Sequence, residues 1–230
     1  MGTRNLTAVM VDGKYALAQY GQWDGYPEGQ GATALEFCRK MQDSFGWVHF
    51  REQLKRVRFV ESDELRKMYD SVGADGSGWV GMDVSAKFDA KWPYFSRDHG
   101  AKILEMVNNA NGEVLTSYDL NFAGDSLMCE WVCVVDLDKG VLEFYEGFNH
   151  KPLDDNARFA SLPCSDNKHC SDKYHQCAIV VSWPLYALPL KKDFLAFFKA
   201  REEEKERAEA ETAKLLKYID ETAAKPETTP

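Results

Sequence analysis

The fold is decided by residues 128–145, which read MCEWVCVVDLDKGVLEFY. Met128 to Leu137 is rich in apolar and β-branched residues, Asp138-Lys139-Gly140 is a turn signal, and Val141 to Tyr145 resumes an extended composition. Two such runs joined by a short turn that contains glycine are typical of a β-hairpin. This is the strongest hairpin pattern in the chain, and it predicts a β-sheet.

Two other regions have the composition of strands. Arg4 to Val11 alternates apolar with polar or small residues, Asp12-Gly13 is a two-residue turn signal, and Lys14 to Tyr20 continues the extended pattern. The chain is therefore expected to open with a second hairpin. Ala178 to Trp183 reads as a further, buried strand. Together these segments predict an antiparallel sheet built from hairpins.

Helical spacing appears between the two hairpins. We expect helices over Ala32–Met41, Phe50–Val57, Asp63–Val72 and about His99–Asn108. Trp79 to Tyr94 has no clean period, so we expect that stretch to be irregular. Helices that cover a sheet of hairpins define an α+β fold.

The composition changes after Pro189. From Lys191 onward, a few apolar residues are followed by a long charged run, which predicts a charged helix whose first turns pack on the body. We divide the chain into a single α+β domain over residues 1–190, a charged helical tail over 191–222 and a disordered end over 223–230.

Composition limits the classes of function. The chain has 230 residues, of which 44% are hydrophobic, and a formal net charge of −9. The negative charge argues against broad binding of nucleic acid or of an anionic membrane, because both need a positive field. No apolar run approaches the ~20 residues that span a bilayer, and no basic-then-apolar leader opens the chain. We therefore expect a cytoplasmic protein that does not bind membranes.

The six cysteines are expected to be reduced thiols, because the chain shows no export signal. Cys129 and Cys133 lie in an apolar run and are expected in the core. Three cysteines and two histidines fall within residues 164–177, a density that can bind zinc. No two of these cysteines have the close spacing of a zinc knuckle. We therefore assign no metal ligand and no cofactor, and treat the stretch as a surface loop with zinc as the alternative.

The segment Gln19 to Gly31 reads QYGQWDGYPEGQG and combines glycine with aromatic and polar side chains. Glycine permits backbone angles closed to other residues and Pro27 fixes one angle, so the segment is expected to be a shaped loop at the end of the second strand. Its rings, amides and carboxylates are the groups that bind a base, a sugar or another small polar molecule. The candidate ligand-binding residues are Arg4, Gln19, Tyr20, Gln22, Trp23, Asp24, Tyr26, Glu28 and Gln30. The alternative is that Trp23 and Tyr26 only plug the end of the sheet.

Two further groups carry candidate chemistry. Thr3 precedes a strand, a turn and a strand, as does the nucleophile of amino-terminal nucleophile hydrolases, where cleavage exposes a residue whose own amine acts as base. That mechanism needs cleavage before Thr3, whereas removal of Met1 alone leaves Gly2. Asp125 and Glu130 could supply paired carboxylates for acid–base chemistry or a hard metal, with solvated turn residues as the alternative.

The chain resembles an uncharacterised family of proteins from tailed phages, bacteria and filamentous fungi. The resemblance rests on the opening MGTRNLT, on the segment Gln19 to Gly31, and on Phe122-Ala123-Gly124-Asp125-Ser126 leading through Cys129-Glu130 to Asp136-Leu137-Asp138. It spans roughly residues 1–149 and carries no settled activity. A phage setting implies a small accessory protein that counters host defence.

Three functional hypotheses follow. The leading one is a soluble protein that binds a small polar molecule such as a nucleotide derivative through the Gln19–Gly31 segment, a function that does not need catalysis. The second is an amide hydrolase that uses Thr3 as its nucleophile. The third is an inhibitor that binds a protein partner through the helix after Lys191, whose Leu215 and Leu216 belong to an apolar stripe.

Overall fold

The computed structural model describes residues 2–42, 46–77, 80–164 and 174–223. The chain divides into two compact units at the junction between Leu188 and Pro189. The first unit contains both sheets and helices α1 to α5, and the second contains helix α6. Among the described residues, no helix is long and apolar enough to cross a membrane.

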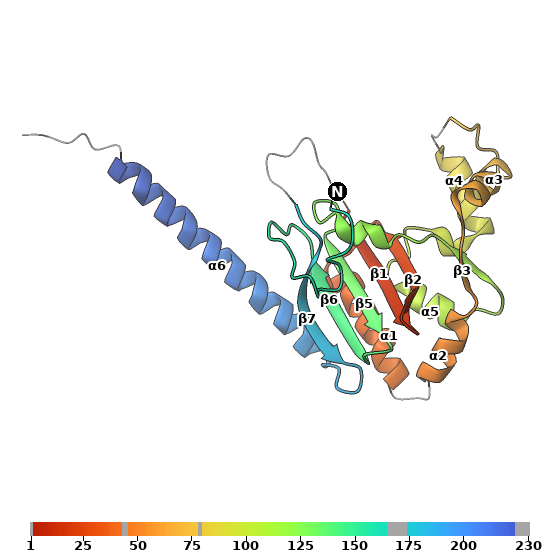
Figure 1. Cartoon of the computed structure of the whole chain (residues 1–230), viewed down its shortest axis with the longest axis horizontal. Helices are drawn as coiled ribbons and strands as arrows, with labels where there is room; N and C mark the ends of the chain where they lie inside the picture. Colours follow the sequence, from red (N-terminus) through yellow and green to blue (C-terminus); the bar gives the residue numbers. More distant parts are fainter. Residues whose placement is uncertain (1, 43–45, 78–79, 165–173, 224–230) are drawn as a thin grey trace, which may run out of the picture. The chain divides into compact units, whose positions relative to one another are not determined.

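A five-stranded sheet runs through the first unit in the order β2-β1-β5-β6-β7 (Figure 1). Its strands are β1 (Asn5–Val11), β2 (Lys14–Gly21), β5 (Trp131–Asp136), β6 (Val141–Glu146) and β7 (Ala178–Pro184). β1 pairs with β2, and β5 with β6, in antiparallel register, so both predicted hairpins are confirmed. At the first turn Asp12 and Gly13 have φ values of 53° and 71°, the left-handed conformation that a tight two-residue hairpin turn requires.

The two hairpins meet through a parallel pair. β1 pairs with β5 from Asn5 opposite Trp131 to Met10 opposite Asp136. The sheet is therefore mixed rather than wholly antiparallel, although its other pairs are antiparallel and the α+β class is confirmed. A parallel pair needs a long crossover, which the helices between β2 and β5 supply. We call the end of the sheet that carries Asn5 and Trp131 the loop end.

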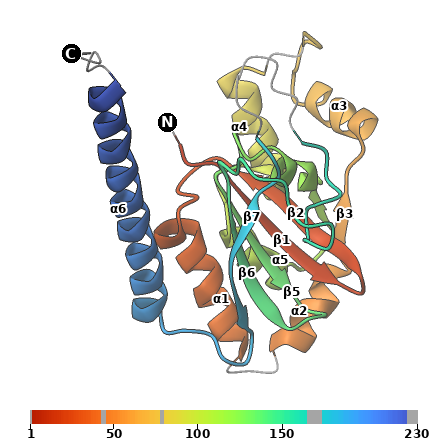
Figure 2. The ribbon, with the colours of Figure 1, turned by 60° about the vertical axis from the view of Figure 1, so that its left-hand side comes forward.

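Helices cover one face of the sheet. Helix α1 (Ala32–Gln42) lies against this face, with α2 (Gly46–Leu54) and α5 (Lys102–Asn108) packed beside it (Figures 1 and 2). The predicted helical spacing of α1 is confirmed, because Leu35, Cys38 and Met41 are all buried. This face of β1 carries Asn5, Thr7 and Val9, and the alternate residues point to the other face.

The opposite face is covered without a long helix. The short 3-10 helix η3 (Leu120–Gly124) and the irregular segment 147–164 pack there around Leu6, Val132, Tyr145 and Phe159. These side chains form a contiguous core with a set of small neighbours: Ala8, Ala18, Ala123, Cys129 and Cys177. The expectation that Cys129 is a core residue is thereby confirmed.

A second, two-stranded sheet joins β3 (Val57–Phe59) to β4 (Val114–Thr116) in parallel, which the sequence did not predict. Beside it lie α3 (Ser62–Asp70), α4 (Met82–Lys91) and the short helix η2 (Pro93–Phe95). The prediction that residues 79–94 are irregular is therefore wrong for α4. Only Phe88 of α4 is buried, so the helix has no apolar stripe to read in the sequence. It is held by the stack of Phe88 on Tyr69, whose ring centroids are 4.0 Å apart.

Several element boundaries also differ from the prediction. Helix α2 begins at Gly46 rather than Phe50, and Val57 belongs to a strand; α5 begins at Lys102 rather than His99. β7 is an edge strand with Ile179 55% exposed, so the expectation of a buried strand is wrong. An edge strand has a pairing neighbour on one side only, which leaves alternate side chains in solvent.

The second unit is a single helix among the described residues. Helix α6 (Lys191–Ala223) has 33 residues and confirms the predicted C-terminal helix. At a rise of 1.5 Å per residue it is about 50 Å long. Its surface carries charged side chains with an ion pair between Lys199 and Glu203 at 3.9 Å. Residues 224–230, which belong to the predicted disordered end, lie outside the described residues.

Candidate functional site

The Gln19–Gly31 segment closes the loop end of the sheet. It leaves β2 and finishes in a short π-helix, η1 (Pro27–Gly31), which runs directly into α1. Asp24 has a φ of 54°, an uncommon left-handed conformation for a residue other than glycine. The Gly25 amide donates to the carbonyl of Thr3 at 3.0 Å, and the Gln30 amide donates to the carbonyl of Asp24 at 2.8 Å. The segment therefore folds back onto the start of β1 as a defined loop.

The glycines of this loop allow close packing. A Cβ added to Gly21 would lie 2.6 Å from Asn5 Oδ1, and one added to Gly25 would lie 2.7 Å from the carbonyl oxygen of Thr3. Neither separation is tolerable for carbon against oxygen. The glycine content is thus explained by the approach of the loop to β1, and it does not by itself indicate flexibility.

Two carboxamides brace the loop from within. Asn5 Nδ2 donates to the carbonyls of Gly21 and Trp23, both at 3.3 Å. Gln30 Nε2 donates to the same Trp23 carbonyl at 3.2 Å, while its Oε1 accepts from the Ala101 amide at 2.8 Å. Gln30, which we predicted to bind ligand, is therefore engaged at both ends of its amide by the fold.

The other predicted amides are also engaged. Gln19 is 3% exposed, and its Nε2 donates to the carbonyl of Tyr94 at 2.6 Å. The hydroxyl of Tyr20 donates to Gln22 Oε1 at 2.5 Å. Burial raises the pKa of Tyr20, which keeps that hydroxyl protonated as a donor. These three side chains shape the loop more than they present groups to solvent.

Arg4 is paired rather than available as an isolated cation. Its Nε lies 3.6 Å from Glu130 Oε1, and its Nη1 donates to the sulfur of Met128 at 3.3 Å. Asp125 has a different role, since its Oδ1 accepts from the Met128 amide at 3.3 Å in the turn before β5. The two carboxylates that we considered as an acid–base pair thus have separate partners.

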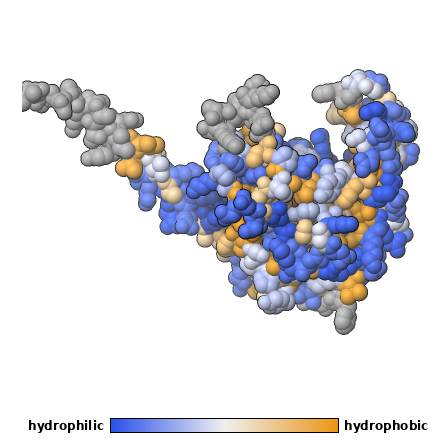
Figure 3. Space-filling model, in the orientation of Figure 1, coloured by the Kyte–Doolittle hydropathy of each residue, from blue (hydrophilic) through white to orange (hydrophobic). Residues whose placement is uncertain are grey.

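The outer surface of the loop is formed by the remaining predicted residues. Trp23 and Tyr26 are 47% and 54% exposed, and Asp24 and Glu28 are exposed beside them. Trp23 Nε1 donates to Asp98 Oδ1 at 2.8 Å, which fixes the direction of its ring. On the face shown in Figure 3, hydrophobic side chains occur in small groups between hydrophilic ones. Exposed rings that are held in place are suited to stacking against a flat ligand group.

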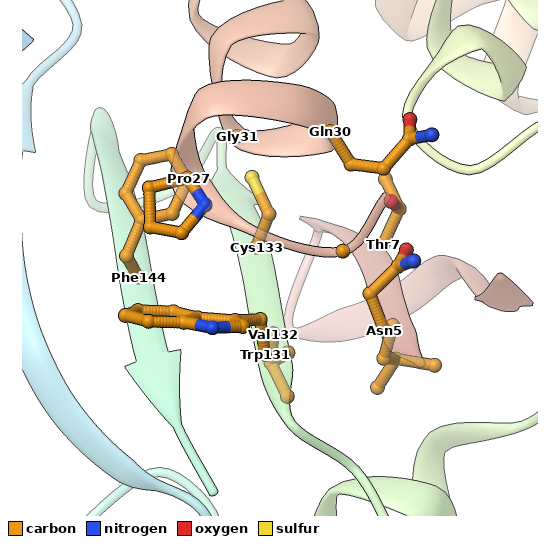
Figure 4. Close-up of a pocket in the computed structure, with 11 residues that line it drawn as sticks. Asn5, Thr7, Pro27, Gln30, Gly31, Trp131, Val132, Cys133 and Phe144 are labelled. Atoms are coloured by element: carbon orange, nitrogen blue, oxygen red, sulfur yellow. The ribbon is translucent and has the colours of Figure 1, made fainter. Parts of the chain in front are cut away.

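A small pocket lies beneath η1, against strands β1, β5 and β6 (Figure 4). It has room for no more than about one water molecule, far less than most small-molecule sites offer. The side chains of Asn5, Thr7 and Cys133 and the rings of Trp131 and Phe144 surround it. The pocket can therefore admit one small group and not a whole nucleotide.

Asn5 supplies the unusual polar group of this pocket. The residue is 3% exposed, and its Oδ1 has no hydrogen-bond donor among the described residues. Because Nδ2 already donates to two carbonyls, the orientation of the amide is determined. A buried acceptor without a donor costs about 1–3 kcal/mol. An N–H or O–H group that reached Oδ1 would recover part of that cost.

Cys133 lines the same pocket but is not suited to nucleophilic chemistry. Burial raises the pKa of the Cys133 thiol far above its ordinary value. The thiolate and not the thiol is the nucleophile, so a protonated, buried Cys133 is inert. We assign Cys133 a lining role, in agreement with the expectation that it belongs to the core.

Thr3, the nucleophile of the hydrolase alternative, is 4% exposed. Its carbonyl accepts from Gly25 at 3.0 Å, which places the residue beneath the loop. A substrate would reach its hydroxyl only after displacement of the loop, in addition to the cleavage that exposes its amine.

Sequence analysis predicted one pocket residue, Gln30, as ligand-binding and missed the residues that the strands contribute. Asn5 and Thr7 belong to an alternating strand, and alternation normally indicates that the polar residues face solvent. Here both faces of the sheet are covered, so the polar residues of β1 are buried at 3% and 1% exposure. The available signal was their position in a strand that sits between two others. The contributions of Trp131, Cys133 and Phe144 depend on strand pairing and had no local signal.

The stretch 164–177 is described in part. His169 and Cys170 lie outside the described residues, whereas Cys164 and His175 are described, with Sγ and Nδ1 4.0 Å apart. Cys177 is buried and its thiol lies 3.5 Å from the carbonyl of Cys129. In the part of the chain that the structure describes, no group of three or more His, Cys, Asp or Glu side chains could hold a metal ion.

Comparison of the chain with protein-family models, with curated proteins and with solved structures found no match.

Proposed function

We propose that the protein captures a small polar molecule at the loop end of its sheet, without converting it chemically. The observation that carries this proposal is the buried, unpaired Oδ1 of Asn5 in a pocket closed by the loop. Buried acceptors are almost always paired, so an unpaired Oδ1 on a residue that lines a pocket supports a donor supplied by a bound molecule. A ligand with an N–H or O–H group supplies that donor.

The pocket is so small that only one part of the ligand can enter it. One donor group about the size of a water molecule enters the pocket, and the rest of the molecule lies outside, against Trp23 and Tyr26. A nucleobase derivative meets these needs, because its edge carries N–H donors and its faces stack on aromatic rings. Arg4 is paired with Glu130, so a phosphate group would bind there in competition with that carboxylate.

The loop is organised before binding. Its backbone is held by Asn5, Gln30 and the amide of Gly25, and Trp23 is held by Asp98. A site whose groups are already fixed loses little conformational entropy when the ligand binds. A loop fixed by hydrogen bonds in this way is suited to recognising a ligand, and recognition needs no catalytic group.

The test is native mass spectrometry of the protein purified from cells, followed by denaturation. We expect an additional mass that disappears on denaturation, and a rise in melting temperature when the identified compound is added back. Cys133→Leu fills the pocket and should abolish the additional mass, while Trp23→Ala should weaken retention. Thr7→Val keeps the side-chain size and removes one polar group from the pocket, so reduced retention by this variant is expected without loss of the fold.

Tyr186→Ala is the matched control. Tyr186 is 81% exposed and follows β7 at the end of the sheet opposite the loop. This variant should retain the ligand as the unchanged protein does. Equal retention by Cys133→Leu, or a ligand-free protein whose melting temperature is unaffected by nucleobases, nucleosides and nucleotides, contradicts the proposal.

The resemblance to phage proteins supports a more specific role, in which capture of a nucleotide derivative removes a signal that host defence needs. In that case, host cells that express the unchanged protein should lose their defence against an infecting phage. Host cells that express Cys133→Leu should keep that defence. The resemblance suggests the phage context, and the pocket suggests how the molecule would be captured.

A partner-binding role of α6 is the second candidate. Leu215 and Leu216 are 59% and 58% exposed on this helix, although apolar side chains normally seek burial. Deletion of residues 200–230 should abolish activity in the same infection assay if the helix binds a host protein. Full activity of the truncated chain contradicts this alternative.

A further inference from the structure

Cys164 and His175 form a pair that the proposed ligand site does not use. They come from the two ends of the 165–173 gap in the described residues, and Sγ lies 4.0 Å from Nδ1. Of the described cysteines, Cys38, Cys129, Cys133 and Cys177 are buried, whereas Cys164 is partly exposed. The accessible thiol is therefore the one that lies beside an imidazole.

The separation of the two atoms suits a shared metal ion. Zinc binds thiolate at about 2.3 Å and imidazole at about 2.0–2.1 Å, which gives about 3.5–3.6 Å between the ligand atoms in a tetrahedral site. The pair at 4.0 Å reaches that value with a shift of about 0.4 Å, which a side-chain rotation supplies. As a sulfur–nitrogen hydrogen bond alone, a contact of this length contributes little.

Both residues stand on anchored backbone. The His175 amide donates to the carbonyl of Asn149 at 2.8 Å, and the neighbouring Gln176 donates through its side chain to the carbonyl of Leu162 at 2.7 Å. Next to Cys164, the carbonyl of Pro163 packs so closely on Gly124 that an added Cβ would lie 2.1 Å from it. The two ligand positions are thus held close together by separate contacts with η3 and the segment 147–164. This favours metal binding, because little backbone has to become ordered when the ion binds.

We propose that Cys164 and His175 are two ligands of a soft divalent cation of the zinc class. A thiolate and an imidazole favour zinc or cobalt over magnesium or calcium, which prefer oxygen. Water completes the coordination in the simplest arrangement. With two protein ligands the site binds an exchangeable ion and differs from a closed structural site of four ligands. His169 and Cys170 lie outside the described residues and are not included.

Binding requires that both ligands be unprotonated. The thiol S–H bond breaks, a sulfur–metal bond forms, and the proton passes to solvent; a protonated imidazole must release a proton in the same way.

The experiment is titration of the full, reduced chain with Co²⁺, followed by displacement with Zn²⁺. We expect one equivalent of cobalt, a sulfur-to-cobalt charge-transfer band, and loss of the band when zinc is added. Cys164→Ser should abolish the band, and His175→Gln should weaken cobalt binding by at least roughly tenfold. Thermal melting of both variants checks that the fold is retained.

His99→Gln is the matched control, because His99 is described, partly exposed and, through its ring, bonded to the carbonyl of Pro93. It should bind cobalt as the unchanged protein does. Absence of the charge-transfer band overturns the proposal, as does a band that survives in Cys164→Ser. Binding by His175→Gln equal to that of the unchanged protein, or equal loss in His99→Gln, also overturns it.

Discussion

Replacement of Arg158 by methionine should cost this protein a large part of its stability. The guanidinium lies on the sheet face opposite α1, with Nη2 at 2.5 Å from Asp136 Oδ2 and 2.6 Å from Glu143 Oε2. Its Nε also donates to the hydroxyl of Tyr145 at 3.0 Å. The side chains of the arginine and of both acids are at most 8% exposed. Arg158 thus fastens the irregular segment 147–164 to β5 and β6.

The magnitude follows from what the substitution leaves behind. Asp136 and Glu143 remain buried without a cation, and breaking a buried ion pair in this way costs about 3–5 kcal/mol. For a chain of this size about 1 kcal/mol corresponds to about 2–4 °C, so the melting temperature should fall by roughly 6–20 °C. Methionine approximates the length of the arginine stem, which limits the contribution of a cavity.

Differential scanning calorimetry at pH 7.5 provides the assay. Combination of Arg158→Met with Asp136→Asn and Glu143→Gln should restore part of the loss, because no unpaired charge then remains buried.

Arg58→Met is the control. Arg58 also contacts two carboxylates, Glu64 at 2.7 Å and Glu113 at 2.9 Å, but its side chain is 43% exposed. Exposed pairs contribute little, so its melting temperature should remain within experimental error of the unchanged value. Equal losses from Arg158→Met and Arg58→Met, or a triple variant less stable than Arg158→Met alone, would refute the reasoning from burial.

Three further predictions concern the fold. Gly147→Ala should destabilise the protein by about 1–3 kcal/mol, because its Cβ would lie 2.1 Å from a main-chain oxygen. In the control Gly112→Ala the added Cβ meets nothing within 4 Å, so the denaturation midpoint should not change. The amide of Gly13, followed by that of Asp12 and the charge of Arg51, holds the pKa of Asp138 below its ordinary value of 3.8. A lowered folded pKa gives stability that is present above the unfolded value and lost as the pH falls through the folded value, so Asp138→Asn should show a smaller drop in melting temperature between pH 5 and pH 3. Phe88→Ala should cost about 3–5 kcal/mol by removing a ring that is 1% exposed, measured by urea denaturation, and a change below 1 kcal/mol would show that α4 unfolds independently.

The candidate site is smaller than the sequence suggested, because side-chain amides that were expected to bind ligand form hydrogen bonds within the fold. Gln19 and Gln30 have the side chains of a recognition loop, but both donate to main-chain carbonyls within the fold. Composition gives the hydrogen-bonding capacity of a side chain and not its partner. Among the predicted residues, Trp23, Asp24, Tyr26 and Glu28 are the ones that lie exposed on the loop.

Local patterns determined the features that depend on neighbouring residues. The Asp12-Gly13 and Asp138-Lys139-Gly140 turns predicted both hairpins, since the conformation of a tight turn is set by the residues within it. The apolar spacing of α1 and the length of α6 were likewise readable, because helical hydrogen bonds link residues four apart. The Gln19–Gly31 segment was recognisable as a shaped loop for the same reason.

Only the tertiary structure decided what these elements enclose. The parallel pairing of β1 with β5 sets Asn5 beside Trp131 and brings Thr7 opposite Cys133, although these residues are far apart in the chain. It also decides that the polar side of β1 faces α1 instead of solvent. Arg158 contacts Asp136 and Glu143, and Cys164 lies beside His175. Arg158 and Cys164 belong to an irregular segment whose sequence has no periodic pattern. The hairpins, α1, α6 and the loop were predictable from the sequence, because their interactions are local. The pocket and both side-chain pairings depend on the packing of distant segments, which local patterns do not encode.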